Sequence, residues 1–448
     1  MLIRFIIENV FSFGNRKEFN MFPYKRLKTL NNHRYKIQNF ELLKMAAIYG
    51  ANGAGKSNLV NALQLFQELV EEEEIPFKLK QAQFKFHSKE HNKKQTLAVE
   101  FLQDNIAFYY GIEILENIII TEELYQSGLG LEADKLIFER KTDNKGITSV
   151  TFLDDFENDT KSQVLKAVLL EELIKADKPI FKLIANRNNI FLKDVKKAYK
   201  WFEKTLQIIT PNSKLRALAH KIDIDSNFKK YAEDMISSFG IGITSLRTDK
   251  TELRAFLGKD AKDNFDFLVE AVEKSPEKMI ALRNHNNELF LSKENENIIV
   301  KQLKIGHSNE NIKDILFDLE DESDGTIRLL DFVPAFKNVA SQQKVYIIDE
   351  IERSIHPLLI KKLIKKFSLD IHTKGQLIFS THESNLLDQK IFRQDEIWFA
   401  EKDRFGSTDL YPLSDFKEHK TTDIQKGYLN GRYGSIPFLS NLQDLNWY

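Results

Sequence analysis

The chain has 448 residues and a mass of 52.2 kDa, more than one ordinary domain of about 100–200 residues, so two lobes are expected. Its 65 basic and 66 acidic residues nearly cancel, which gives no argument for or against a nucleic-acid partner. The absence of cysteine excludes disulfides, thiolate nucleophiles and cysteine-bound zinc. No apolar run approaches the roughly 20 residues of a membrane span, and we expect a cytoplasmic protein with no membrane partner.

The first elements are strands. Residues 2–13 and 18–22 are rich in β-branched and aromatic residues, and residues 44–49 predict a buried strand. This strand leads into Gly50-Ala51-Asn52-Gly53-Ala54-Gly55-Lys56-Ser57, after which apolar residues recur at helical spacing to about Val70. A strand, a glycine-rich loop and a helix in this order are typical of a phosphate-binding loop.

The residue types of this loop fit a triphosphate. Gly50, Gly53 and Gly55 let the backbone curl so that N–H groups point at phosphate oxygens, and the helix N-terminus adds positive charge. In this pattern Lys56 reaches the β- and γ-phosphates and Ser57 ligates Mg²⁺. The segment therefore predicts a nucleoside triphosphate and Mg²⁺ as ligands. The alternative is a glycine-rich turn at a helix start.

A set of short strands follows the first helix. That helix ends in Glu71–Glu74, which we interpret as a solvated helix end rather than a functional acidic patch. Turn residues Asp104-Asn105 and Glu116-Asn117 separate the first three strands and predict hairpins. An antiparallel meander is therefore expected, with strands at 97–101, 106–114, 118–124 and 135–140.

The middle of the chain has a helical pattern with many lysines, over residues 160–235 and about 262–283. Tyr199 and Trp201 stand among these lysines, so the helices could contact nucleic acid or a partner. An amphipathic helix with a solvated lysine face explains the same pattern and is the favoured interpretation.

The last third alternates strand and helix, as in a parallel sheet. The apolar strand 344–349 ends in Asp349-Glu350. Asp349 at that strand end suits a Mg²⁺-associated carboxylate, and Glu350 suits a group that orients or deprotonates the attacking water. Lys56 and Asp349 are far apart in the sequence, so a large insertion separates the two halves of the site. The further expected elements are a helix at 357–368 and strands at 375–380 and 395–400.

Several of these positions carry a family resemblance. Asn9-Val10-Phe11-Ser12-Phe13 resembles the opening strand of the ATP-binding-cassette (ABC) ATPases of the SMC, RecF and OLD group, and more closely of a bacterial family typified by RloA and the AbiL ATPase. Gly50 to Asn58 is similar to that family's G-x-N-G-x-G-K-S-N loop, with Asn52 and Asn58 at the two asparagine positions.

The resemblance implies an α/β fold, an ABC-type P-loop ATPase head with an antiparallel β meander and an inserted helical domain. Residues 1–155 would form the N-terminal part of the head, 156–300 the helical insertion, and 301–448 the C-terminal part with the signature, the carboxylate pair and a switch histidine.

Two further segments gain a role only from the resemblance. Ser323-Asp324-Gly325-Thr326 stands where the cassette signature would be, so Ser323, Gly325 and Thr326 would contact the γ-phosphate bound by a second protomer. Asp324 and Thr326 replace the usual glycine and glutamine, and a helix N-cap is the alternative role of this segment. Thr381-His382-Glu383 resembles the switch segment, with His382 as γ-phosphate sensor; the alternative is a surface or capping histidine.

Other resembling segments are less specific. Ser354-Ile355-His356-Pro357 is similar to the family's D-loop, Gln81 and Gln83 are candidates for its Q-loop glutamine, and Gly427–Phe438 resembles the RloA-type C-terminus.

The function implied is hydrolysis of ATP with Mg²⁺ at composite sites of a homodimer or higher oligomer, with Lys56, Glu350 and His382 in catalysis. Hydrolysis would act as a switch in bacterial phage defence through a separately encoded effector, for which a TOPRIM-like nuclease is a candidate. The stretch after His382 is shorter than a domain of about 100 residues, so no nuclease is expected on this chain. The alternative is an SMC- or RecF-like ATPase that binds DNA directly; a GTPase is disfavoured because no Asn-Lys-x-Asp segment is found.

Overall fold

The structure, a computed structural model, contains two compact units. It describes residues 1–37, 39–86, 94–213, 218–258, 262–275, 277–284, 287–308 and 315–436, with the main chain only at 262, 263, 283, 284 and 287. Unit 1 comprises Met1–Pro211, Asn338–Glu352 and Lys361–Tyr448, and unit 2 comprises Asn212–Lys337 and Arg353–Ile360.

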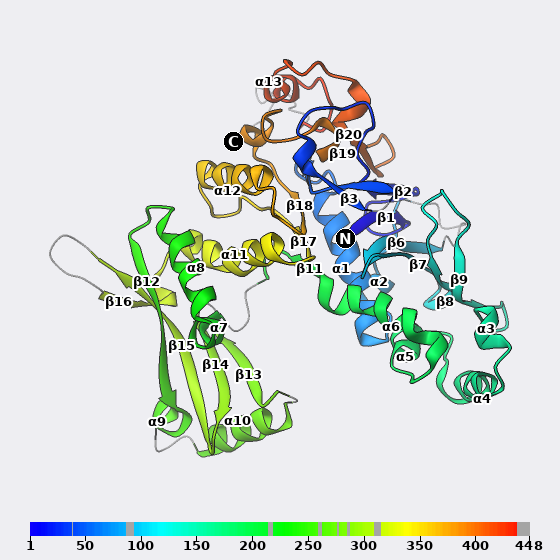
Figure 1. The fold of residues 1–448 in the computed structure, drawn as a ribbon, viewed down its shortest axis with the longest axis horizontal. Coiled ribbons are helices and arrows are strands. Elements are labelled where there is room, and N and C mark those ends of the chain that lie inside the picture. Colours follow the sequence, from blue (N-terminus) through cyan, green and yellow to red (C-terminus); the bar gives the residue numbers. More distant parts are fainter. Residues whose placement is uncertain are drawn as a thin grey trace, which may run out of the picture. The chain divides into compact units, whose positions relative to one another are not determined.

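A mainly parallel sheet forms the centre of unit 1 (Figure 1). Five of its strands run parallel and β20 pairs antiparallel to β19, so the carboxyl ends of the parallel strands meet at one edge. The parallel sheet predicted from the last third is therefore confirmed, although no α-helix separates β18 from β19 in residues 381–396, all of which the structure describes. In spatial order the strands are β11 (Leu206–Ile209), β17 (Val345–Ile348), β18 (Gln376–Ser380), β5 (Met45–Tyr49), β19 (Ile397–Lys402) and β20 (Thr408–Pro412).

The predicted meander is the other sheet of unit 1. Asp104, Asn105, Glu116 and Asn117 all have positive φ, between 49° and 65°, as two-residue hairpin turns require. In spatial order the strands are β10 (Thr148–Phe152), β9 (Lys135–Thr142), β8 (Ile118–Gln126), β7 (Ile106–Leu115), β6 (Gln95–Gln103), β1 (Leu2–Glu8) and β2 (Lys17–Asn20).

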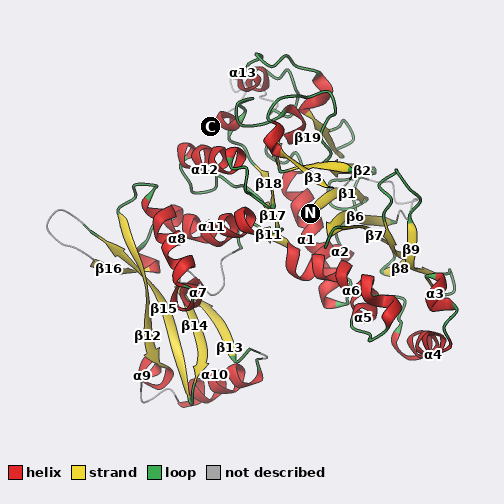
Figure 2. Ribbon diagram, in the orientation of Figure 1, coloured by secondary structure: helices red, strands yellow, loops and turns green. Residues whose placement is uncertain are grey.

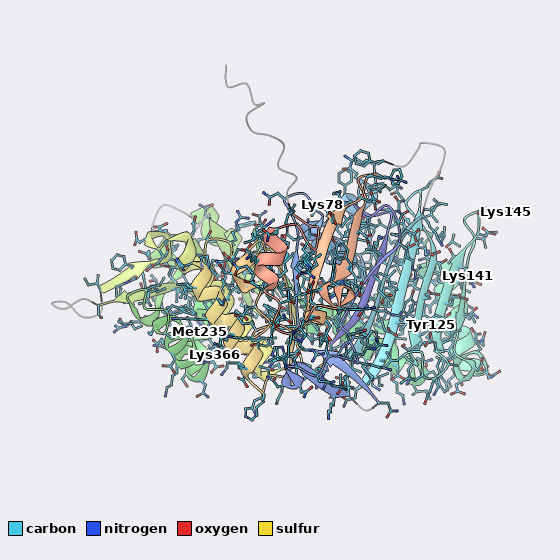
Figure 3. All side chains as sticks on the ribbon, turned by 90° about the horizontal axis from the view of Figure 1, so that it is seen from above. Lys78, Tyr125, Lys141, Lys145, Met235 and Lys366 are labelled. Carbon is cyan, nitrogen blue, oxygen red and sulfur yellow. The ribbon has the colours of Figure 1, made fainter. Side chains whose placement is uncertain are left out.

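One face of this sheet is packed against helices (Figure 2). Phe66 of α1 contacts Phe5 and Tyr110, and Phe181 of α5 also contacts Tyr110. The other face carries polar residues, among them the exposed Lys141, which is labelled in Figure 3. The helices of unit 1 that precede β11 are α1 (Lys56–Glu72), α2 (Phe77–Lys80), α3 (Asp154–Glu157), α4 (Thr160–Val168), α5 (Phe181–Ala185) and α6 (Lys193–Lys200).

The lysine-rich helical stretch packs into this core. Trp201 is fully buried and stacks on Phe101 at 4.5 Å, and Tyr199 is 9% exposed. Aromatic side chains held inside the core are not available to stack on nucleic-acid bases. The structure therefore supports an amphipathic helix with a solvated lysine face.

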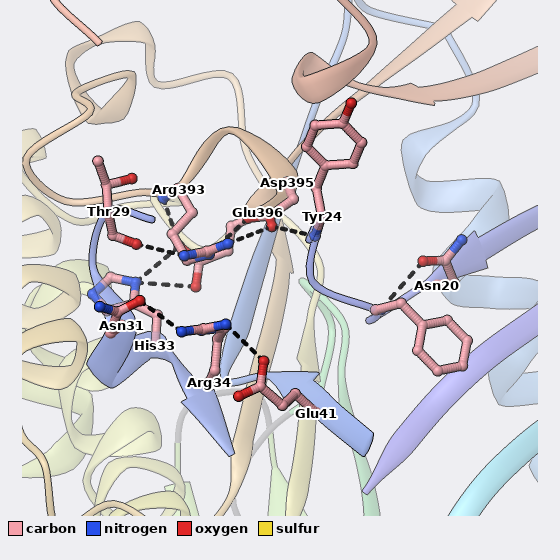
Figure 4. A network of polar contacts seen from close by, with 11 residues as sticks. Asn20, Tyr24, Thr29, Asn31, His33, Arg34, Glu41, Arg393, Asp395 and Glu396 are labelled. Atoms are coloured by element: carbon pink, nitrogen blue, oxygen red, sulfur yellow. Dashed lines mark hydrogen bonds and ion pairs between the residues drawn. The ribbon is translucent and has the colours of Figure 1, made fainter. Parts of the chain in front are cut away.

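A buried polar network fixes the start of β19 (Figure 4). Arg393 is fully buried and donates to both carboxylate oxygens of Asp395, at 2.9 and 2.7 Å, and to the carbonyl of Thr29. Asp395 also accepts from the main-chain N–H of Tyr24 at 2.7 Å. The Nδ1 atom of His33 lies 2.9 Å from Glu396 Oε2, and burial raises the pKa of Glu396. The N-terminal segment is thereby tied to the parallel sheet.

Unit 2 contains a second antiparallel sheet with its own apolar core, which includes Leu253, Val272, Leu291, Ile298 and Val300. Within it β12 pairs with β15, β15 with β14 and β16, and β14 with β13. The elements are α7 (Leu218–Ile224), α8 (Ser226–Ser237), β12 (Ile243–Glu252), α9 (Leu253–Leu257), α10 (Lys262–Lys274), β13 (Met279–Asn284), β14 (Asn287–Glu294), β15 (Asn297–His307) and β16 (Ile315–Asp318).

The insertion predicted as helical over 156–300 is thus mixed. The predicted helix over 262–283 is α10 followed by β13, and α10 ends at Lys274, shortly before Pro276, which lacks the N–H that a helix needs. The strand β11 lies inside the predicted helical stretch 160–235. It has four residues, which is too short to interrupt the helical pattern of the sequence. The boundaries of the two units differ from the predicted domain boundaries at 155 and 300. The first stretch of unit 1 extends to Pro211, because the helices before β11 pack in the core of that unit.

The remaining α-helices are α11 (Asp324–Ser341) and α12 (Pro357–Leu369), where the chain passes between the units, and α13 (Ile424–Leu429) near the C-terminus. Separately, β3 (Arg34–Ile37) and β4 (Phe40–Leu43) form a hairpin. The last residues of the segment Gly427–Phe438, Pro437 and Phe438, lie outside the described residues.

Replacing Glu122 by Ala should destabilise the fold. Glu122 is fully buried, accepts from the N–H groups of Ile180 and Phe181, and pairs with the buried Arg140 at 3.3 Å. The variant leaves the Arg140 charge buried and unpaired, so we expect a loss of about 3–5 kcal/mol. Chemical denaturation followed by tryptophan fluorescence would measure it.

The matched control is Glu139→Ala, which removes a carboxylate from the next strand. Glu139 pairs with the exposed Lys141, so its loss should cost about 0–1 kcal/mol. Equal losses in the two variants would contradict a stabilising role for the buried pair.

Candidate functional site

The loop after β5 curls around the ammonium group of Lys56. The Nζ atom of Lys56 donates to the carbonyls of Gly50 and Ala51, at 2.8 and 3.1 Å, and the residue is 4% exposed. Gly53 and Gly55 have φ of 77° and 111°, and a Cβ on Gly55 would lie 2.1 Å from Thr408 Oγ1. The loop conformation therefore requires these glycines.

Polar side chains from the turn after β1 and from β20 hold the loop. The Oγ atom of Ser12 accepts from Asn58 Nδ2 at 2.8 Å and lies 2.7 Å from Thr408 Oγ1. Thr408 Oγ1 also donates to the carbonyl of Ala54 at 2.8 Å. Asn58 thus has a structural partner in this network, whereas Asn52 is exposed at the loop tip.

The carboxylate pair lies at the end of β17. Ser380, the last residue of β18, donates from Oγ to Asp349 Oδ1 at 2.5 Å and accepts from the N–H of Glu350 at 2.8 Å. Glu350 has φ of 49°, which is uncommon for a residue with a side chain and turns the chain sharply at the strand end. Asp349 is buried, and Glu350 is partly exposed.

Lys56, His382 and the carboxylates form one electrostatic cluster. Burial lowers the pKa of Lys56 to about 8, against the opposing charges of Asp349, Glu352 and Glu350. The Nδ1 atom of His382 lies 3.4 Å from Lys56 Nζ. Burial, and then the charge of Lys56, lower the pKa of His382, so its imidazole is neutral near pH 7.

Glu352 belongs to this cluster and was missed by the sequence analysis. Its Oε1 atom accepts from the main-chain N–H of His382 at 2.6 Å. The signal available in the sequence was a third acidic residue directly after the carboxylate pair, in Asp349-Glu350-Ile351-Glu352. Such a residue looks like a solvated turn carboxylate until the neighbouring strand is placed.

The donor set fits Mg²⁺ held jointly with phosphates. Ser57, half-buried at the start of α1, and Asp349 offer oxygen ligands, which Mg²⁺ prefers. In the described part of the chain no group of three or more His, Cys, Asp or Glu side chains is placed to hold a metal ion.

The signature-like segment Ser323–Thr326 lies in unit 2. Ser323 Oγ accepts from the N–H of Thr326 at 3.2 Å. Ser323 is therefore the N-cap of α11, which is the alternative role predicted for this segment. A Cβ on Gly325 would lie 2.5 Å from the carbonyl oxygen of Ser354, so this position needs glycine for packing alone. The signature-like and D-loop-like segments are therefore in contact within unit 2.

A pocket of about 440 Å³ opens beside Ser12 and Asn58. Its other walls include Phe11 and Phe86 together with Gln81 and Gln83, the two Q-loop candidates. Lys78, labelled in Figure 3, also lines it.

Among the described residues, no helix combines the length and the apolar composition that crossing a bilayer demands.

Comparisons with solved structures find Smc head domains. An SmcHead bound to the C-winged helix domain of ScpA is 14% identical, with a TM-score of 0.42 and coverage of 93% of this chain and 99% of that one. The SMC head domain from Thermotoga maritima is 10% identical, with a TM-score of 0.37 and coverage of 92% and 98%. An Smc head domain with an extended coiled coil, bound to the C-terminal domain of ScpA derived from Pyrococcus furiosus, is 13% identical, with a TM-score of 0.41 and coverage of 96% and 99%.

No curated protein matches the sequence. A family model described as "AAA domain, putative AbiEii toxin, Type IV TA system" matches residues 45–388, which is more than three quarters of the chain and includes the loop, the carboxylates and His382. The chain belongs to this family of AAA domains.

Proposed function

We propose that this chain is an ATPase of the ABC type, as its resemblance to the SMC, RecF and OLD group implies. The observation that supports it is the meeting of Lys56, Asp349, Glu350 and His382 at one edge of the parallel sheet. A phosphate-binding loop alone can bind a nucleotide. A loop beside a partly exposed carboxylate and a neutral histidine can also support proton transfer.

Each residue has its own role. When the triphosphate binds, the ammonium group of Lys56 leaves the carbonyls of Gly50 and Ala51 and neutralises phosphate charge. The negative phosphates favour the charged form of Lys56, which burial disfavours. Ser57 and Asp349 hold Mg²⁺, which supplies charge neutralisation at the phosphates when it is bound. Glu350 accepts a proton from the attacking water, and His382 contacts the γ-phosphate.

The pocket beside Asn58 suits the base and ribose of the same nucleotide. Its apolar walls include Phe11 and Phe86, and aromatic rings stack on a purine ring. Ser12 and Asn58 line both the pocket and the flank of the phosphate loop, so one ligand can occupy both places. ATP is the triphosphate that we propose.

The active form is proposed to be a homodimer or a higher oligomer with composite sites. Each protomer would present Ser323, Gly325 and Thr326 to the triphosphate of its neighbour. These residues stand at the N-terminus of α11, where the positive end of the helix dipole attracts an anion.

The biological role that we propose is a switch in bacterial phage defence, in the cytoplasm, with a separately encoded effector such as a TOPRIM-like nuclease. The support is the resemblance to the RloA and AbiL type and the family description, which names an abortive-infection toxin. The second candidate is direct DNA binding in repair or chromosome maintenance, which the resemblance to SMC and RecF proteins supports.

Replacing Glu350 by Gln should leave ATP binding intact and lower turnover by about 10²-fold or more, because the proton acceptor is lost. The variant should also accumulate as an ATP-bound dimer, measured by light scattering after gel filtration. Lys56→Ala should instead lose ATP binding, because the buried cation of the loop is gone.

The control for this pair is Glu401→Gln, near the end of the parallel strand β19, where the carboxylate accepts from the hydroxyl of Tyr411. Its turnover should match the wild type. Unchanged turnover in the Glu350 variant would remove Glu350 from the mechanism.

Cells that carry the chain with its neighbouring genes should resist phage, and the Lys56→Ala substitution should abolish that resistance, since the switch no longer binds ATP. Plaque counts measure this outcome. Resistance that survives the substitution would contradict a defence role driven by ATP.

DNA-stimulated turnover, with an affinity for duplex DNA that falls steeply with salt, would favour the second candidate.

A further inference from the structure

Glu352 connects two strand ends of the site. It follows the carboxylate pair after β17, and its Oε1 atom accepts from the main-chain N–H of His382, which follows β18, at 2.6 Å. This hydrogen bond to a charged acceptor fixes the main chain of His382 directly. The ring of His382 is thereby held with its Nδ1 atom 3.4 Å from Lys56 Nζ.

The other carboxylate oxygen of Glu352 is unusual. Oε2 is buried and has no hydrogen-bond partner among the residues that the structure describes. A buried carboxylate oxygen without a partner costs free energy, and such atoms are rare in native proteins.

The surroundings of Glu352 are the groups of the nucleotide site. Its negative charge acts on Lys56 and on His382, and it is the strongest charge acting on Tyr49, the residue before Gly50. Asp349 and Glu350 face the same lysine and histidine. The hydroxyl of Tyr49 is also buried without a partner in the described structure.

We propose that Glu352 is the positioning residue of His382: it holds the histidine main chain at the distance from Lys56 that turnover requires, and acts on the reaction only through that histidine. This inference rests on the proposed ATPase function. It assigns to Glu352 no contact with the nucleotide and no proton transfer.

Substitutions at Glu352 and His382 test the proposal through their combination. Glu352→Ala should lower kcat by about 10²-fold, since misplacing a group by about 1 Å has that effect, while KM changes by less than about threefold. His382→Ala should have a similar effect, and the double variant should be no slower than His382→Ala alone. Glu352→Gln keeps an oxygen that accepts the His382 N–H and should recover most of the lost kcat.

A second readout needs no hydrolysis. Hydrogen exchange at the main-chain amide of His382, measured on the nucleotide-free chain, should speed up by about tenfold or more in Glu352→Ala and remain slow in Glu352→Gln. Glu401→Ala removes a carboxylate from β19, which β5 separates from β18, and should leave this amide unchanged.

The outcomes separate the two proposals. Additive losses of kcat in the double variant, or amide exchange unaffected by Glu352→Ala, would overturn the role of Glu352. A wild-type chain that binds ATP without hydrolysing it would overturn the proposed function instead, and the amide exchange would still decide whether Glu352 positions His382.

Discussion

The ammonium group of Lys56 is buried, and the rest of the site is built around that constraint. A cation removed from water must be compensated by hydrogen bonds and opposite charge. The carbonyls of Gly50 and Ala51 supply the first, and Asp349, Glu350 and Glu352 supply the second. Because the loops after β5, β17 and β18 all contribute, the three strands must end at the same edge of one sheet, as their parallel register allows.

The same edge explains the close packing of the phosphate loop. Gly55 passes so near Thr408 that no side chain fits, and Thr408 in turn bonds to Ala54 and contacts Ser12. The turn after β1, which carries Ser12, and the strand β20, which carries Thr408, thereby restrain the loop. A restrained loop keeps its N–H groups oriented before a phosphate arrives, which lowers the entropy lost on binding.

Local patterns predicted much of this arrangement. The loop, the carboxylate pair and the meander depend on residue types close together in sequence, such as Asp104-Asn105 in a turn with positive φ. Glu352 and β11 were missed because their roles come from neighbours in space: the N–H of His382 for one and the parallel partner β17 for the other. The sheet of unit 2 was missed because half-exposed strands such as β12 carry charged residues at the positions that face solvent.

In the proposed dimer, a triphosphate is shared between the phosphate loop of one protomer and the signature-like segment of another. Mixing Lys56→Ala protein with Ser323→Arg protein tests this arrangement, because each variant alone lacks one half of every composite site. Random pairing leaves about a quarter of the sites intact, so the mixture should regain about a quarter of wild-type turnover. A mixture as inactive as its two components, or full turnover by the Ser323→Arg protein alone, would rule out the composite site.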